Sequence, residues 1–102
     1  MSRTILKYVL QQGVHVPLEL PSSAQFLHLH QQRDIGVCLW FLVDTEAPKI
    51  IRFFSTIVTG CQAPPLAAKY MGTAHLQEGS CAVHVFEVYG GEEVQHTLPI
   101  GF

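Results

Sequence analysis

Short apolar runs, broken by proline or glycine about every ten residues, extend along most of this 102-residue sequence. Within several runs, apolar and polar side chains alternate, which is the period of a β-strand and not of an amphipathic helix. No run reaches the roughly 18 apolar residues that a membrane-spanning helix needs. The pattern therefore predicts an all-β chain, a small single-domain barrel or sandwich of six to seven mostly antiparallel strands.

We expect the strands to begin and end at the proline and glycine positions. Pro17 indicates an edge strand or a bulge, because proline cannot donate to a β-ladder. The run 35–43 is apolar on both faces and is expected at the centre of a sheet. One helical turn is expected at residues 66–69. The predicted strands are Arg3–Leu10, Val14–Leu20, Ala24–Gln31, Ile35–Val43, Lys49–Thr59, Tyr70–Gln77 and Cys81–Tyr89.

The last two predicted strands are expected to form a C-terminal β-hairpin. Gly79-Ser80 suits a two-residue turn of type II′, in which glycine takes the first position. Gly72, in the middle of its strand, would leave room for a neighbouring side chain. This turn predicts the cross-strand pairs His75–His84, Thr73–Phe86 and Gly72–Glu87.

The length of the chain suits one hydrophobic core. Residues 1–89 are expected to form the all-β domain, and residues 90–102 an extended tail that docks on the domain or on a neighbouring subunit. Apolar residues make up 48% of the chain and charged residues only 14%, so we expect a folded protein with some apolar surface covered by a partner. A homo-oligomer is the simplest such assembly.

Charge and cysteine content argue against several functions. The net charge is -2 and the six Lys and Arg residues are scattered singly, so no basic surface is expected to bind nucleic acid. Three cysteines without CxxC spacing predict neither a disulfide framework nor a zinc site. The N-terminal apolar run is too short for a signal peptide. We therefore expect a cytoplasmic protein without a cofactor or membrane contact.

Five motifs occur in order between residues 3 and 89, namely TIxKY, LWxxVD, RxFxxxxTG, YxGT and HVFE. Together they resemble a family of small bacteriophage and prophage proteins without an established activity. The resemblance implies an accessory protein in the host cytoplasm that counters host defence, either by sequestering a nucleotide signal or by capping a defence protein. The tail after Tyr89 departs from the family pattern.

Arg52 is the strongest candidate for ligand binding. It lies in a strand interior between pairs of isoleucines and phenylalanines, where an unpaired guanidinium is costly. Its partner is expected to be an internal carboxylate of Asp44, Glu87 or Glu19, or else an anionic ligand or another chain. Aromatic and hydroxyl side chains could complete such a site, although aromatic residues on central strands also serve cores. The predicted ligand-binding set is Arg52, Phe54, Thr59, Trp40, Tyr8, Tyr70 and His84.

Catalysis receives little support from the sequence. His28 and His30 share one face of a predicted strand and could ligate a metal, with solvated or interface histidines as the alternative. GxSxG, P-loop and HExxH patterns are absent, so we expect a protein that is not an enzyme.

Three functions stay open at this stage. The first is a binding protein that sequesters a small anionic ligand, such as a nucleotide, around Arg52. The second is an inhibitor or accessory subunit that caps a host protein, in which case Arg52 is paired internally. The third is a small cupin-like metal-dependent enzyme that uses His28, His30 and another histidine.

Overall fold

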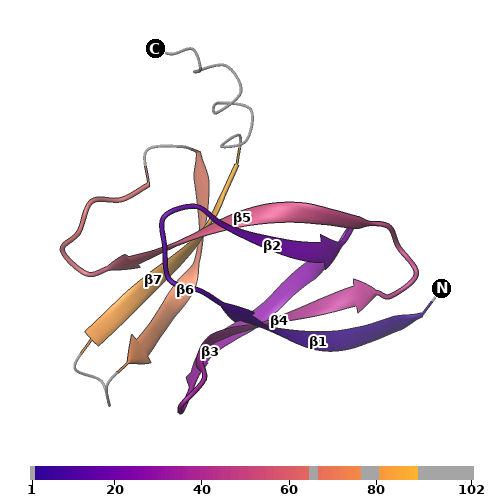
Figure 1. The fold of residues 1–102 in the computed structure, drawn as a ribbon, viewed down its shortest axis with the longest axis horizontal. Helices are drawn as coiled ribbons and strands as arrows, with labels where there is room; N and C mark the ends of the chain where they lie inside the picture. Colours follow the sequence, from indigo (N-terminus) through magenta and orange to yellow (C-terminus); the bar gives the residue numbers. More distant parts are fainter. Residues whose placement is uncertain (1, 65–66, 77–80, 90–102) are drawn as a thin grey trace.

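The computed structural model describes residues 2–64, 67–76 and 81–89, and these form seven strands and no helix (Figure 1). The all-β prediction is confirmed. No described segment is a helix long and apolar enough to cross a membrane. The strands are β1 Arg3–Leu10, β2 Val16–Pro21, β3 Gln25–Gln32, β4 Gly36–Asp44, β5 Lys49–Val58, β6 Ala68–Leu76 and β7 Cys81–Val88.

The strands form two antiparallel sheets, which pack as a sandwich and not as a closed barrel. One sheet has the order β1-β4-β3 and the other the order β2-β5-β7-β6 (Figure 1). The apolar strand β4 lies at the centre of its sheet, as predicted. The strand β2, which contains Pro17, lies at an edge, also as predicted.

The core joins the two sheets through side chains on their facing surfaces. Phe41 of β4 and Phe54 of β5 are fully buried, and their ring centroids lie 6.4 Å apart. Gly72 of β6 has a φ of 151°, and a Cβ added there would lie 3.1 Å from Cδ2 of Leu29 on β3. Glycine therefore allows these strands to approach closely, as predicted for Gly72.

The prediction of a helical turn at residues 66–69 is wrong for residues 67–69, the part of this segment that the structure describes. Strand β6 begins at Ala68, two residues earlier than predicted. Ala68 lies opposite Val88 and Lys69 opposite Glu87. Pairing with β7 therefore extends the strand toward the N-terminus, into the segment that was predicted as a helical turn.

The β6–β7 hairpin is confirmed, but its predicted register is wrong by two residues near the turn. The last described pair joins Leu76 to Cys81, and the predicted turn at Gly79-Ser80 lies outside the described residues. From Gly72 to Leu76, a slip of two residues leaves each side chain on its predicted face, because strand side chains alternate with period two. The observed pairs are Thr73–His84, His75–Ala82 and Gly72–Val85.

Candidate functional site

The structure separates the predicted ligand-binding residues into several environments. Phe54 is fully buried in the core, and Tyr8 packs edge-on against Phe41 with ring centroids 5.8 Å apart. Burial raises the pKa of the Tyr8 hydroxyl. Trp40 lies on the outer face of the three-stranded sheet, the face turned away from the other sheet. Arg52 lies between the sheets, whereas Thr59, Tyr70 and His84 meet on the outer face of the four-stranded sheet.

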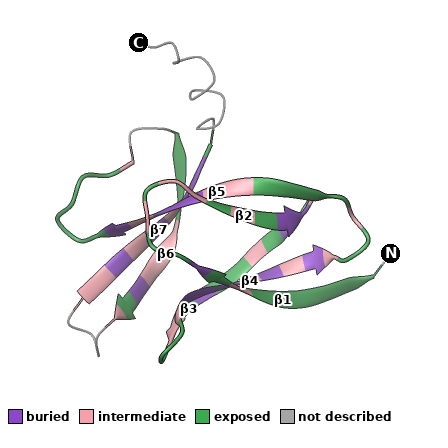
Figure 2. Ribbon diagram, viewed as in Figure 1, coloured by how far each residue is buried: buried purple, intermediate pink, exposed green. Residues whose placement is uncertain are grey.

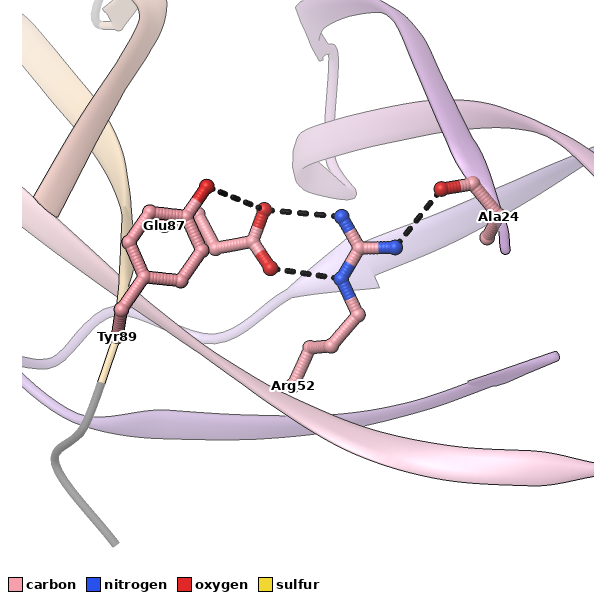
Figure 3. Close-up of polar contacts among 4 residues, drawn as sticks. All are labelled: Ala24, Arg52, Glu87 and Tyr89. Atoms are coloured by element: carbon pink, nitrogen blue, oxygen red, sulfur yellow. Dashed lines mark hydrogen bonds and ion pairs between the residues drawn. The ribbon is translucent and has the colours of Figure 1, made fainter. Parts of the chain in front are cut away.

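Arg52 is paired inside the protein (Figure 3). Its Nε donates to Oε2 of Glu87 at 2.6 Å, and its Nη2 donates to Oε1 of the same carboxylate at 2.9 Å. Its Nη1 donates to the backbone oxygen of Ala24 at 2.8 Å. Of the three carboxylates predicted as internal partners, Glu87 is the one observed.

The surroundings of Arg52 favour its charged form. The hydrogen bond with Glu87 is the main reason that the pKa of Arg52 is raised above its ordinary value. The guanidinium also lies 5.4 Å from the ring centroid of Phe41, a cation–π distance. Tyr89 donates its hydroxyl proton to Glu87 at 3.5 Å, and burial raises the pKa of that hydroxyl. Each guanidinium nitrogen already has a protein acceptor.

A cavity of about 480 Å³ opens beside the ion pair. A second cationic residue, Lys69, also lines this cavity and lies opposite Glu87 in the β6–β7 ladder. The cavity is lined by Ala24, Gln25, Phe26, Arg52, Lys69, Tyr70, Met71, Glu87 and Tyr89.

Three hydroxyl side chains meet around the imidazole of His84. We call these four residues, which come from three chain segments, the His84 cluster: Thr59, Tyr70, Thr73 and His84. Oγ1 of Thr59 lies 2.7 Å from Nε2 of His84. Oγ1 of Thr73 and the Tyr70 hydroxyl each lie 3.1 Å from Nδ1. The Tyr70 hydroxyl and Oγ1 of Thr73 also share a hydrogen bond. Both ring nitrogens therefore contact hydroxyl groups.

Local geometry explains this convergence. Thr73 lies directly opposite His84, and the β6 register shifts between Tyr70 and Gly72. Without the bulge, Tyr70 would lie opposite Glu87. The extra residue places it opposite Phe86, one pair closer to His84, so that its hydroxyl reaches His84. Just after β5, Gly60 adopts a φ of 95°, and the resulting turn holds Thr59 over Nε2.

A cavity of about 230 Å³ lies beside the His84 cluster. Its lining combines hydroxyl and imidazole groups with apolar side chains, and includes the exposed thiol of Cys61. A hydroxyl can turn its proton toward either of two acceptors, and an imidazole can change tautomer, so the cluster can redirect donors toward a bound group. The lining residues are Ile57, Val58, Thr59, Gly60, Cys61, Ala63, Tyr70, His84 and Phe86.

The sequence did not single out Thr73, because the predicted register placed it opposite Phe86. Gly72 could signal the bulge that displaces Tyr70, but not the pairing of Thr73, which shares one register with the pairs from Gly72–Val85 to Leu76–Cys81. The carbonyl of Ala24 could not be found from the sequence either. It precedes β3 in the other sheet, 28 residues from Arg52.

The predicted pair of histidines lies on the outer face of β3. The ring centroids of His28 and His30 are 6.1 Å apart, and their shared face agrees with the prediction. Within residues 2–64, 67–76 and 81–89, no group of three His, Cys, Asp or Glu side chains is placed to hold a metal ion. The cupin-like function thus has no ligand set in this part of the chain.

A family model described as a domain of unknown function (DUF7352) matches residues 1–96. The match includes all seven strands and extends beyond Tyr89, where the motif resemblance ends. No curated protein and no solved structure matches the chain.

Proposed function

Since the chain belongs to the family described as a domain of unknown function (DUF7352), we propose its function from its own side chains: it binds a small phosphate-bearing ligand at the His84 cluster. One observation carries the proposal. Hydroxyls lie 2.7 to 3.1 Å from both nitrogens of a partly exposed imidazole, beside a cavity of about 230 Å³. This cavity is large enough for a small anion, and the side chains of Thr59, Tyr70 and His84 in its lining can donate hydrogen bonds.

The chemistry of the His84 cluster suits a phosphate group. Phosphate oxygens accept hydrogen bonds, and a protonated imidazole donates from both nitrogens while supplying a positive charge. Hydroxyls of Thr59 and Tyr70 line the same cavity and supply neutral donors. Ile57 and Phe86 add apolar surface for the remainder of the ligand. A nucleotide signal, the ligand that the phage resemblance implies, carries both phosphate and apolar parts, and stays a prediction.

The proposal moves the predicted anion site from Arg52 to His84. The guanidinium of Arg52 is engaged by Glu87 and Ala24, and its charge is balanced by the carboxylate. A ligand at Arg52 would therefore compete with a bidentate ion pair, which is among the stronger hydrogen-bonded arrangements in proteins. A ligand at His84 has only hydroxyl groups to reorient.

The proposal is tested by titrating inorganic phosphate at pH 6 and following backbone amide and histidine ring signals by NMR. We expect shifts at Thr59, Gly60, Thr73 and His84, and their loss in His84→Gln. The matched control is His30→Gln, which changes an exposed histidine in the other sheet and should leave the shifts intact. AMP and dinucleotides then extend the series from phosphate to nucleotides.

Two results would overturn the assignment. The first is a titration in which no signal of the His84 cluster moves. The second is a set of shifts centred on Arg52 and Lys69, which would place the anion in the cavity of about 480 Å³.

A second candidate function, binding of a host protein, is favoured by the pairing of Arg52. That function required an internally paired Arg52, and Glu87 provides the partner. Several large aliphatic side chains are also exposed on the two sheets and offer contact area. Silence toward both phosphate and nucleotides would favour this function over the first. The exposed aliphatic residues include Ile5, Val9, Leu27, Ile50 and Ile51.

A further inference from the structure

The four edge strands of the two sheets differ in how they hinder the addition of another strand. Strand β2 carries Pro17 and Pro21, and proline has no backbone N–H to offer. Strands β3 and β6 each contain a register shift, at Leu27 and Met71 respectively. Strand β1 pairs with β4 over Arg3–Leu10 without proline or bulge. Of the four edges, β1 is therefore the regular one, open to pairing.

Strand β1 is exposed on both of its faces from Arg3 to Lys7 (Figure 2). On the outer face, Ile5 is 57% exposed and Val9 41% exposed. Leu6 points to the same side as buried Phe41, its neighbour in β4, yet it is 38% exposed. The second sheet thus leaves this end of the sandwich uncovered. Within the described residues β1 pairs with no strand other than β4.

We propose that β1 pairs antiparallel with β1 of a second copy of the chain, about a two-fold axis at Leu6. The two three-stranded sheets then become one continuous sheet with the order β3-β4-β1-β1-β4-β3. The backbone groups on the free edge of β1 would find partners, and the exposed aliphatic side chains would be covered. This dimer lies on the sheet that does not carry the His84 cluster, so it is independent of the proposed ligand function.

Charge selects the register of this pairing. A two-fold axis perpendicular to the sheet keeps the outer faces of the two copies on the same side. One residue of β1 must then lie directly opposite the same residue of the second copy, with the axis between them. An axis at Ile5 would place Arg3 opposite Lys7, and an axis at Lys7 would place two lysines opposite each other. Like charges directly opposite destabilise a sheet. Leu6 on the axis gives the longest overlap without opposed cations.

The resulting neighbours are favourable on both faces. On the inner face, Leu6 meets Leu6 of the second copy, and Thr4 meets its Tyr8. On the outer face, the stem of Lys7 covers Ile5 of the second copy, and Arg3 lies beside its Val9. Aromatic and β-branched cross-strand pairs of this kind stabilise antiparallel sheets.

Solution mass tests the proposal. We expect light scattering to give twice 11.3 kDa for the wild-type chain. Leu6→Lys places two lysines on the axis and should return the mass of one chain. The matched control Ile51→Lys changes a residue that is 55% exposed on β5, an interior strand, and should keep the dimer. A wild-type monomer, or a Leu6→Lys dimer, would overturn the proposal.

Cross-linking tests the register itself. With Cys61 and Cys81 changed to serine, Leu6→Cys should form an intermolecular disulfide on oxidation, because the two Cα atoms would lie opposite across the axis. Thr4→Cys should not, since its neighbour is Tyr8 of the second copy. Efficient cross-linking through position 4, without cross-linking at position 6, would rule out this register. Phosphate titration of Leu6→Lys should match the wild type, whichever result is found.

Discussion

The Arg52–Glu87 pair and the His84 cluster lie on opposite faces of one sheet and share β5 and β7, while the cluster also uses β6. Arg52 and Glu87 come from β5 and β7 and face the core, with side chains 20% and 9% exposed. His84 comes from β7 and Thr59 follows β5, and both face solvent. The first arrangement is closed, because each guanidinium nitrogen has a protein acceptor. The second is open, because its hydroxyl donors can turn toward a cavity.

The difference teaches how to interpret polar residues in an apolar strand. A full charge near a core has to find a partner within the fold, so its burial indicates a structural ion pair. Neutral hydroxyls and an imidazole on a solvent-facing surface carry no such requirement. Their convergence on one point is therefore the stronger indication of a binding site.

The largest effect is expected when the closed pair is broken. Glu87→Ala leaves the largely buried guanidinium of Arg52 without its carboxylate, and should lower the free energy of unfolding by about 3 kcal/mol. By thermal unfolding, Tm should fall by at least about 10 °C. The control Glu19→Ala removes an exposed carboxylate on β2 and should change stability by less than about 0.5 kcal/mol. Equal Tm values for the two variants would mean that Arg52 is adequately solvated without Glu87.

A smaller effect is expected when both members of the pair are replaced. Arg52→Met with Glu87→Leu removes the charges together and fills much of the same volume. The double variant should lie within about 1 kcal/mol of the wild type in chemical denaturation, because apolar replacement of a buried pair is often neutral. It should also bind phosphate normally at the His84 cluster. Loss of phosphate binding in a folded double variant would show that the two arrangements are not independent.

A comparable change in the open cluster should affect binding and not stability. Tyr70→Phe removes one hydroxyl donor, and we expect phosphate affinity to fall about fivefold, the equivalent of about 1 kcal/mol. Tyr89→Phe is the matched control, because it removes a hydroxyl that contacts the closed pair instead. Calorimetric titration of both variants should separate them. An equal loss of affinity in Tyr89→Phe would contradict the distinction between the two sites.

The smallest effect concerns alkaline pH. Burial, and then the charge of Glu87, raise the pKa of the Tyr89 hydroxyl, so the folded chain retains a proton that the unfolded chain loses near pH 10. Stability should therefore fall as pH rises through this range. Tyr89→Phe should reduce the fall in Tm between pH 9 and 11 by about 1 °C. Burial of Tyr8 acts in the same direction, so part of the fall should persist. An unchanged pH profile in Tyr89→Phe would exclude this contribution of Tyr89.

Much of the fold was predictable from residue patterns. The start of β1 and the central place of β4 follow from side-chain alternation and from a run that is apolar on both faces. The candidate site was only partly predictable. Thr59, Tyr70 and His84 were among the expected ligand-binding residues, but Arg52, Phe54 and Trp40 were expected to share their site and lie elsewhere. Thr73 was missed because the predicted register of the β6–β7 hairpin was wrong by two residues, which placed Phe86 and not His84 opposite it.

Strand identity and, outside the bulges in β3 and β6, the facing of side chains followed from the sequence, because both depend on a period of two that each strand carries locally. Even the error of two residues in the β6–β7 register preserved the face on which His84 lies. Tertiary structure alone decided which of three carboxylates pairs with Arg52, and that Ala24 supplies the remaining acceptor. Contacts between separate strands and sheets depend on loops and bulges, whose geometry side-chain alternation does not encode.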